Sequence, residues 1–492
     1  MKVLIICTEK LPVPPVRGGA IQTYIAGIAP FLGQKHEITI IGRNDPSLPD
    51  QETKEGIQYV RVPGGLLETY RQGIVDYLNS NSSFDLIHIF NRPRLVTSVR
   101  ECAPSARIFL SMHNDMFKPQ KINPDEGQIA IQEVEKIITI SDYIGQAITE
   151  WFPEAAPKLK TIYSGVDLDR FVPVYSTKAE KIRKKIRKEY NLEGKKVILF
   201  AGRLSANKGA HVLVRAMNNL AKNHSHVALV LMGSKWFSDN RVTDYVSYVR
   251  SLAERSPVPV ITTGFVSPDK IQDWFAAADI FVCPSQWQEP LARVHYEAMA
   301  SGLPIVTTNR GGNPEVVERN KNGFIVEKPG DPKEFAEHLS TLLNNAQLCK
   351  EMGQYGRKLA EEKYHWDRVV HDILEVWNEI EQKVKNNIPI NVEATEEQVT
   401  VEEVEEQDVL VTEIEIAAES DTEIEEIMEE TEELEEVEKV EEDEEEVEEV
   451  EKVEEDEEEV EEIDEAEEKR NRGIFVCYYN PPAPPWINTR AG

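Results

Sequence analysis

Two glutamates, Glu289 and Glu297, stand with seven residues between them in the stretch "EPLARVHYEAMASGLP". Pro290 is favoured in a first helical turn, so we expect Glu289 at a helix start and a helix over 292–301. The two carboxylates would then be about 12 Å apart along the axis and about 80° apart around it. A ligand lying along this helix start could touch both, with an anionic centre at the helix N-terminus, which is the layout of a nucleotide-sugar. The spacing alone favours a capping acid and a solvated helix glutamate.

A basic loop, "AGRLSANKG" (residues 201–209), follows the apolar run "KKVILF" and precedes a helical pattern. This order places Arg203 and Lys208 on a strand-to-helix turn at the carboxyl end of a parallel strand, where open α/β sheets bind ligands. A planar guanidinium and a lysine point charge together suit a diphosphate. On their own, the two residues fit surface charges equally well.

Two loops from the N-terminal half carry weaker signals. In "EKLPVPPVRGGAIQTY", Gly18 and Gly19 precede a helical pattern, and glycine there lets backbone N–H groups approach a phosphate. In "LSMHND", His113 directly follows the apolar run "ARIFL", again at the carboxyl end of a predicted strand. A Gly-Gly pair alone usually marks a turn, and a single histidine is more often structural.

Metal-binding and disulfide patterns do not accompany these residues. The "DLD" at 167–169 matches a metal-binding acid pair, but it lies between the predicted domains, where chance explains it better. Five scattered cysteines without a CxxC pair are typical of reduced, intracellular proteins. The apolar run after Met1 is too short for a signal peptide, and no run is long enough to cross a membrane. We expect a cytoplasmic protein that needs neither a metal nor a cofactor.

The elements that must position these loops are visible as short apolar runs through residues 1–330. These are "VLII", "EITII", "FDLIHIF", "ARIFL" and "KIITI", followed by "KKVILFAG", "HVALVLMG", "VPVITTGF" and "ADIFVC". Strand-like runs that alternate with helical periodicity indicate parallel βαβ units and an α/β fold class. The alternation breaks once, in a stretch that lacks an apolar strand and ends in a basic helix. We therefore predict two Rossmann-like domains facing across a cleft, at 1–165 and 191–386, a linker at 166–190, and a closing helix within the second domain.

The composition changes sharply near the C-terminus. Residues 391–470 contain 43 of the 88 acidic residues and 4 of the 55 basic ones, with an identical 13-residue repeat at 436–448 and 449–461. Dense like charge opposes a stable helix, so we expect a disordered acidic tail at 387–470 and an unstructured, aromatic and proline-rich end at 471–492. The rest of the chain is close to neutral, which leaves room for an anion-binding cleft.

These motifs resemble the family 4 glycosyltransferases, which are retaining enzymes of GT-B fold. The resemblance covers about residues 1–380 and rests on five motifs in order: "RGGA", "SMHN", "GRLSANKG", the paired glutamates in "EPLARVHYEAMASGLPIV", and "GGNPE". It is specific because both the order and the spacing hold. Within the family, the chain looks most like the spore coat protein SA group, through "TEKLPVPPVRGGAIQTY", "GSKWFSDN" and "PSQWQEPLARVHYEAMA".

The resemblance implies a role for each candidate residue. Glu289 would hold hydroxyls of the donor sugar and Glu297 the ribose, while His113 would approach the sugar at its reacting face. The other positions would contact the donor as follows: Arg203 and Lys208 at the diphosphate, Gly18 and Gly19 beside it through their backbone, Phe265 and Val266 at the base, Gly233 and Ser234 along the cleft, and Leu291 and Ala292 next to the donor.

The resemblance also implies a reaction. A sugar would move from a nucleotide-sugar to an unidentified glycan, lipid or protein acceptor, on one face of the sugar and without a metal. Fixed positive groups would stabilise the departing diphosphate. Ala292 departs from the family pattern because many members have glycine there, and its methyl group could crowd the donor.

A rival interpretation is a structural or scaffold protein of the spore coat that keeps the transferase fold with weak or no activity. A third is a relative that binds nucleotide-sugars and performs another reaction, such as epimerisation. The acidic tail could gather cations or a basic or coat-protein partner, or could serve only as a solubilising extension. We expect no nucleic-acid partner. Nucleotide binding would separate the scaffold from the two enzymes.

Overall fold

The computed structural model describes residues 1–81, 83–235 and 242–390. Within this part, the chain forms two α/β lobes, each built around its own sheet. None of the helices in these ranges combines the length and hydropathy that a membrane crossing requires. The predictions for the acidic tail beyond residue 390 and for the end at 471–492 concern residues outside the described ranges.

The first lobe holds a sheet of eight described strands in the order β3-β4-β2-β1-β5-β6-β7-β8. All neighbouring strands are parallel except β3 and β4. The strands are β1 (Lys2–Ile6), β2 (Glu37–Arg43), β3 (Gln51–Lys54), β4 (Ile57–Val62), β5 (Leu86–Phe90), β6 (Arg107–Met112), β7 (Val134–Thr139) and β8 (Leu159–Thr161). The helices are α1 (Ala20–Leu32), α2 (Leu67–Ser80), α3 (Val96–Cys102), α4 (Pro124–Glu133) and α5 (Asp142–Trp151), with 3-10 turns η1 (Pro93–Leu95) and η2 (Pro153–Lys158).

The second lobe holds a parallel sheet of six described strands in the order β11-β10-β9-β12-β13-β14. The strands are β9 (Lys196–Ala201), β10 (Val227–Met232), β11 (Val260–Thr262), β12 (Ile280–Cys283), β13 (Ile305–Thr308) and β14 (Gly323–Val326). The helices are α6 (Thr177–Glu189), α7 (Ala210–Leu220), α8 (Asp244–Glu254), α9 (Ile271–Ala277), α10 (Val294–Ala300), α11 (Pro332–Asn344) and α12 (Ala346–Lys363). Three 3-10 turns are η3 (Ala206–Lys208), η4 (Pro268–Lys270) and η5 (Asn313–Val316).

The apolar runs in the sequence become the central strands of both sheets. In β1, "KVLII", every residue after the first is buried, because a central parallel strand is covered by helices on both faces. Ile6 lies between Ile41 of β2 and Ile89 of β5 in the ladder. The α/β prediction is therefore confirmed. The structure adds five strands that the quoted runs do not predict, namely β3, β4, β8, β13 and β14.

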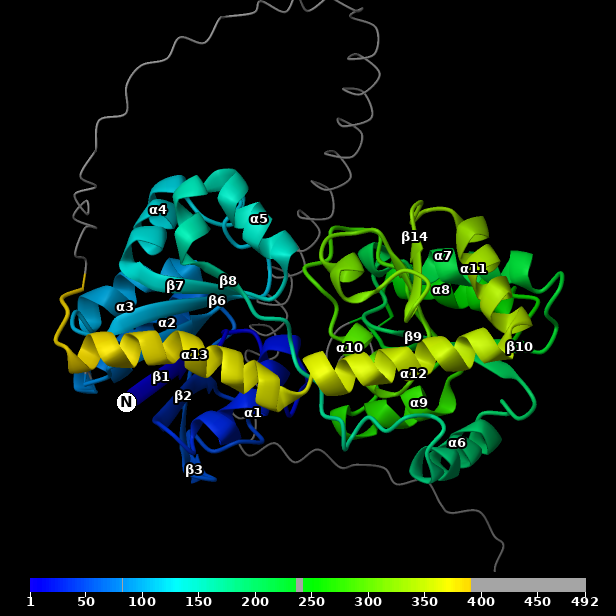
Figure 1. Ribbon diagram of the computed structural model, residues 1–492, viewed down its shortest axis with the longest axis horizontal. Helices are drawn as coiled ribbons and strands as arrows, with labels where there is room; N and C mark the ends of the chain where they lie inside the picture. Colours follow the sequence, from blue (N-terminus) through cyan, green and yellow to red (C-terminus); the bar gives the residue numbers. More distant parts are fainter. Residues whose placement is uncertain (82, 236–241, 391–492) are drawn as a thin grey trace, which may run out of the picture. The chain divides into compact units, whose positions relative to one another are not determined.

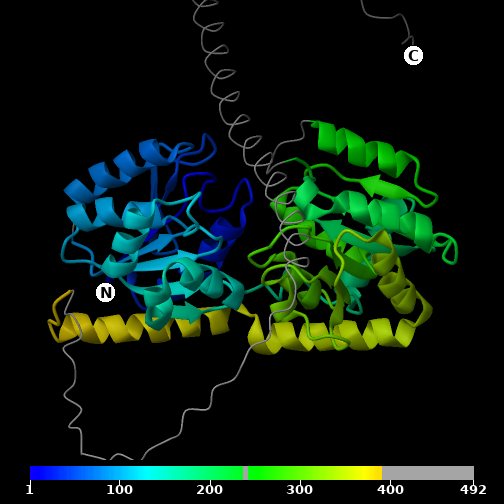
Figure 2. The ribbon, with the colours of Figure 1, turned by 90° about the horizontal axis from the view of Figure 1, so that it is seen from above.

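The last described helix, α13 (Trp366–Lys385), packs against the first lobe, whereas the sequence prediction assigns it to the second domain. Its buried side chains Ile373, Trp377 and Ile380 join Tyr24 and Ile25 of α1 in one core cluster. Figures 1 and 2 show α13, in yellow, beside the elements of the first lobe. The assignment was wrong because helical periodicity shows which face of a helix is buried but not which sheet covers it.

The stretch predicted as a linker, 166–190, ends in the basic helix that the sequence predicts, which is α6. Helix α6 packs against α9 of the second lobe, where Arg183 and Arg187 each donate to the carboxylate of Asp279 at 2.5 Å. The arginine-rich part of the stretch is thus fixed to the second lobe. The basic residues of this helix neutralise a largely buried acid directly before β12.

Candidate functional site

Lys208 and Glu289 meet where the strand order of the second sheet reverses. In the order β11-β10-β9-β12-β13-β14, the loops after β9 and β12 leave neighbouring strands in the middle of the sheet. Ligands of open α/β sheets bind outside the carboxyl ends of the strands at such a reversal. Lys208 follows β9 and Glu289 follows β12, and the Lys208 Nζ lies 2.7 and 2.5 Å from the two Glu289 carboxylate oxygens. Residues 81 positions apart are therefore brought together.

The Glu289 carboxylate is buried and heavily hydrogen-bonded. Besides Lys208, the hydroxyl of Ser285 donates to it at 2.8 Å and the indole N–H of Trp287 at 2.9 Å. Burial raises the pKa of Glu289, but the charge and hydrogen bonds of Lys208 and the hydrogen bonds of Ser285 and Trp287 outweigh it and hold the pKa below its ordinary value. The side chain is therefore an ionised acceptor in a fixed position, ready to receive hydroxyl donors.

Gly209 allows the two loops to lie in contact. It has a left-handed backbone (φ 71°), and a Cβ added there would lie 1.9 Å from the backbone oxygen of Pro284, just before the Glu289 loop. A third loop, after β13, approaches in the same way, since a Cβ on Gly311 would lie 2.1 Å from the backbone oxygen of Glu289. Close backbone packing thus fixes the position of the carboxylate from two sides.

The helix expected to begin beside Glu289 begins later. Helix α10 starts at Val294, so Glu289 lies in the preceding loop and not in a first helical turn. The predicted distance of 12 Å along one helix axis therefore does not apply. Glu297 is on α10, where its carboxylate lies 3.3 Å from Arg293 one turn earlier. The boundary was misplaced because Pro290 fits an extended loop as readily as a helix start.

His113 follows β6 in the first lobe, as predicted, and is buried. The side-chain oxygen of Asn91 accepts the backbone N–H groups of His113 and Asn114, at 3.0 and 2.9 Å, and so holds this turn. The imidazole packs edge-on against Tyr24, with 4.8 Å between the ring centroids. Burial, with a smaller contribution from the charge of Arg293, lowers the pKa of His113 to about 3. The ring is therefore neutral at physiological pH.

The glycine pair precedes α1 as expected. Gly18 and Gly19 both have positive φ, 95° and 103°, a region that side chains with a Cβ rarely adopt. A Cβ on Gly19 would lie 2.2 Å from the amide oxygen of Gln22, whose amide nitrogen donates to Thr8 at 3.0 Å. The loop is closely packed onto the end of β1, so its glycines are required by the fold.

The other predicted positions divide into backbone and core residues. Gly233 has φ 143° and forms a bridge to Gly264, which places Ser234 and Phe265 at the ends of neighbouring strands. Leu291 is 4% exposed and lies in the core of the second lobe, so its side chain is not available to a donor. Arg203 lies in the loop after β9, Val266 follows β11, and Ala292 lies in the loop before α10. The backbone N–H of Ala292 donates to the side-chain oxygen of Asn313 at 3.1 Å.

Direct contacts between the lobes lie next to this site. The hydroxyl of Ser141 donates to the backbone oxygen of Pro290 at 2.6 Å. The carboxylate of Glu315, from the "GGNPE" motif, accepts the first N–H groups of α5, from Asp142 and Tyr143, at 2.8 Å each. An acid at a helix N-terminus is favourable because the unpaired N–H groups there carry partial positive charge. The "GGNPE" motif thus joins the two lobes through Glu315.

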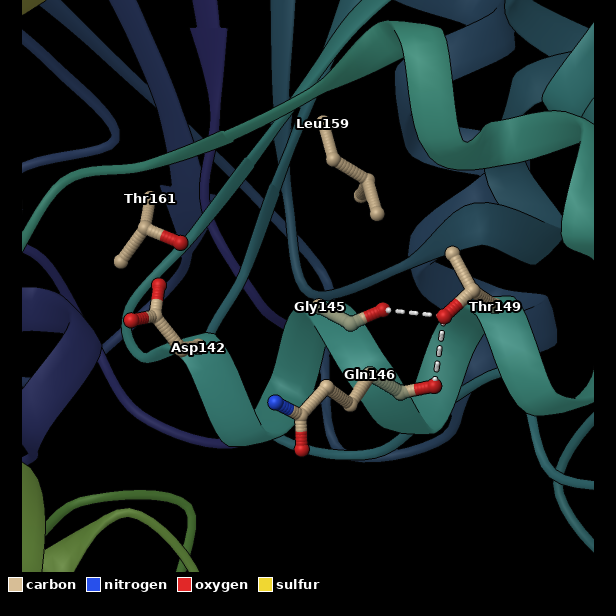
Figure 3. A pocket seen from close by; sticks show the side chains of 6 residues that line it. All are labelled: Asp142, Gly145, Gln146, Thr149, Leu159 and Thr161. Atoms are coloured by element: carbon tan, nitrogen blue, oxygen red, sulfur yellow. Dashed lines mark hydrogen bonds between the residues drawn. The ribbon is translucent and has the colours of Figure 1, made fainter.

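An open pocket of about 330 Å³ lies between α5 and β8, lined by Asp142, Gly145, Gln146, Thr149, Leu159 and Thr161. Figure 3 shows Thr149 turned back onto its own helix, where its hydroxyl donates to two backbone oxygens of the preceding turn at 3.3 and 2.9 Å. None of the residues lining this pocket is a predicted site residue. We therefore do not include it in the candidate site.

Sequence reasoning missed four residues that shape the site: Ser285, Trp287, Asn91 and Ser141. Ser285 and Trp287 lie close after β12, so their position in "PSQW" was an available signal. Asn91 and Ser141 act through contacts between distant segments, which no local pattern reveals. Within the described residues, the "DLD" stretch caps a turn, since Asp167 accepts the backbone N–H groups of Asp169 and Arg170 at 3.0 and 2.9 Å.

Buried histidines make stability depend on pH. Burial lowers the pKa values of His88 and His113 to about 3 and that of His295 to about 4, from an ordinary 6.5. The unfolded chain therefore takes up protons that the folded chain does not, and stability is lost as pH falls below 6.5. Between pH 6.5 and its pKa in the folded protein, each of these histidines should lower the free energy of unfolding by about 1.4 kcal/mol for each unit by which the pH falls.

Urea unfolding at pH 7, 6 and 5 would measure this slope. His88→Gln replaces a histidine outside the candidate site and retains a polar group near Ser111, which lies 2.7 Å from the ring. We expect a shallower slope in this variant. An unchanged slope would show that His88 does not contribute.

Two family models match this chain. Glycosyl transferases group 1 matches residues 182–359, and Glycosyltransferase Family 4 matches residues 18–170. The first match includes Lys208 and Glu289, and the second includes His113.

Curated relatives match most of the chain. Spore coat protein SA of Bacillus subtilis is 46% identical over 377 residues, covering 77% of this chain and 99% of the relative. Putative glycosyltransferase YtcC of the same organism is 45% identical over 361 residues, covering 73% and 88%. Lipopolysaccharide 1,2-N-acetylglucosaminetransferase of Salmonella typhimurium is 25% identical over 387 residues, covering 75% and 96%.

Solved structures share the fold. Anabaena HepE in complex with UDP and glucose has a TM-score of 0.62 at 22% sequence identity, covering 77% of this chain and 99% of that chain. Sucrose-phosphate synthase from Thermosynechococcus elongatus has a TM-score of 0.65 at 18% identity, covering 78% and 99%. At these levels of identity, the similarities show the fold alone.

Proposed function

Because this chain belongs to the glycosyltransferases and has their GT-B fold, we propose that it is a retaining, metal-independent transferase that moves a sugar from a nucleotide-sugar donor to a glycan, lipid or protein acceptor. One observation carries the proposal: Lys208 and Glu289 converge at the reversal of strand order in the second sheet. Similarity to spore coat protein SA supports a role in forming the spore coat or another cell-surface glycan.

In this proposal the two charged residues act on opposite ends of the bond that breaks. Glu289 accepts hydroxyls of the donor sugar, and Lys208 stabilises the charge that develops on the leaving diphosphate. Lys208 has three N–H donors, and the two Glu289 oxygens occupy two of them. Within the part of the chain that the structure describes, the third has no hydrogen-bond acceptor, and in this proposal it binds a phosphate oxygen, assisted by Arg203 and the Gly18–Gly19 backbone.

The bond changes follow from retention on one face of the sugar. The bond between the anomeric carbon and the phosphate oxygen breaks, and a bond to the acceptor oxygen forms on the same face. The acceptor proton passes to the leaving phosphate, so no protein base is needed. His113 is neutral and contributes a hydrogen bond at the sugar, while Glu297 holds the ribose and Phe265 and Val266 border the base.

Nucleotide binding tests the proposal first. In a thermal-shift screen of nucleoside diphosphates and nucleotide-sugars, the nucleotides of one base should raise the melting temperature of the protein. UDP is the first to try because HepE binds it. A ligand at 100 times its Kd stabilises a fold by about 2.7 kcal/mol. Arg203→Ala should lose this stabilisation, whereas Arg215→Ala, at an exposed position on α7, should keep it.

The donor that the screen identifies then allows a transfer assay. The anomeric configuration of the product, read by NMR, should match that of the donor. An inverted product would exclude retention. If no nucleotide shifts the melting temperature at millimolar concentration, the alternative of a coat scaffold with a transferase fold is favoured instead.

A further inference from the structure

The two oxygens of the Glu289 carboxylate have different surroundings. Oε2 accepts from Lys208 at 2.5 Å, from Ser285 at 2.8 Å and from Trp287 at 2.9 Å. Among the described residues, Oε1 accepts only from Lys208, at 2.7 Å. A carboxylate oxygen accepts about two hydrogen bonds. Oε1 is therefore the atom with capacity for a ligand hydroxyl, while Oε2 is fully occupied by the protein.

Trp287 exposes a large aromatic surface beside this oxygen. The residue is 37% exposed, although its indole N–H is fixed on Glu289. The Lys208 ammonium lies 5.4 Å from the ring centroid, so the ring has a defined orientation in the site. A tryptophan held by its polar edge, with Lys208 over one face, can present its other face to a ligand with little loss of side-chain freedom.

The charged groups beside the Trp287 ring also determine which sugars can bind, according to the charge of the sugar. The Glu289 carboxylate and the Lys208 ammonium neutralise one another, and both are largely buried, with side chains 8% and 17% exposed. The unoccupied hydrogen-bonding capacity at Oε1 is that of an acceptor. A sugar hydroxyl would complete it, whereas a sugar carboxylate would place like charge against Glu289.

We propose that Trp287 and Glu289 Oε1 form the sugar subsite and that the donor carries a neutral pyranose. A C–H face of the sugar ring packs on the indole, and one hydroxyl donates to Oε1. This inference deepens the proposed function and rests on it. It assigns a specificity role to Trp287, a residue that touches the sugar and not the nucleotide.

Calorimetric titration of a nucleoside diphosphate and of its sugar conjugate separates the two parts of the donor. Trp287→Ala should weaken the nucleotide-sugar by about tenfold, from the loss of one aromatic contact, and leave the diphosphate unchanged. Trp287→Phe keeps a ring and loses the indole N–H, so it should retain most of the affinity. Trp151→Ala removes another exposed tryptophan, 54% exposed on α5, and should change neither ligand.

Each other outcome has a defined meaning. If Trp287→Phe loses as much as Trp287→Ala, the indole acts only by positioning Glu289, and the stacking subsite is wrong. If Trp287→Ala weakens the diphosphate equally, the residue does not select the sugar. A uronic-acid conjugate that binds as tightly as the neutral sugar would also overturn the inference. Failure of the wild type to bind any diphosphate would instead remove the proposed function itself.

Discussion

Replacing Lys208 with methionine should destabilise the protein by about 3–5 kcal/mol, because it leaves the buried Glu289 carboxylate without its countercharge. The same change should lower turnover by about 10²–10³-fold, since the positive group that we propose for the leaving diphosphate is lost. Of the hydrogen bonds from described residues, Glu289 then retains those from Ser285 and Trp287. Urea unfolding and the rate of nucleoside diphosphate release would measure the two effects.

The pH dependence of this variant has a defined sign. In the wild type, the pKa of Glu289 is below its ordinary 4.5, so the pair contributes stability above that pH and loses it as pH falls through the lowered pKa. Without Lys208, burial raises the pKa, and the penalty is relieved as the carboxyl takes up a proton. The stability difference between Lys208→Met and wild type should therefore shrink as pH is lowered from 7 to about 4.5.

A double variant separates stability from catalysis. Glu289→Gln combined with Lys208→Met removes both charges, so most of the stability should return while turnover stays low. Lys208→Met with wild-type stability and turnover would show that the pair is neither a buried ion pair nor part of the site.

Replacing Gly209 with alanine should destabilise the protein by at least about 3 kcal/mol and lower kcat/KM. The added Cβ would lie 1.9 Å from the backbone oxygen of Pro284, so the loops after β9 and β12 must move apart. Lys208 precedes this glycine and Glu289 follows Pro284 by five positions, so the movement would also pull the ion pair apart. Unfolding in urea and steady-state kinetics with the identified donor would measure the two losses.

Gly194 provides a matched control for this variant. Its φ is 72°, against 71° for Gly209, but a Cβ there would have no atom within 4 Å. Gly194→Ala should therefore cost only the left-handed strain, about 1–2 kcal/mol, and leave kcat/KM unchanged. Equal losses in the two variants would show that strain alone, and not loop contact, explains the effect of Gly209.

The sequence predicted the location of the site better than its internal geometry. Arg203, Lys208, His113 and Glu289 could be placed because each follows an apolar strand, and the carboxyl ends of parallel strands share one edge of a sheet. The start of α10 could not be placed, since Pro290 is compatible with both helix and loop. That error removed the geometric argument for the glutamate pair, and the role of Glu297 stays a prediction.

The features that the sequence could not predict are those that depend on tertiary contacts. No pattern around Asn91 shows that its side chain holds the turn at His113. The sequence of α13 shows an amphipathic helix, but its partner is set by the three-dimensional path of the chain. Leu291 follows Glu289 by two positions and was assigned to the donor, yet it fills the core of the second lobe. Local spacing gives proximity along the chain and does not give side-chain direction.

The return of α13 makes the first lobe discontinuous in the gene. Its core requires residues from both ends of the described chain, with Trp377 packed beside Ile25. The end of α13 is anchored there as well, through the Lys383–Glu135 ion pair at 2.6 Å and the donation from Arg107 to Ile388. A single cut in the coding sequence between β8 and β9 therefore does not yield two fragments that each contain a complete core. A separate first lobe would need α13 joined to it by a new connection.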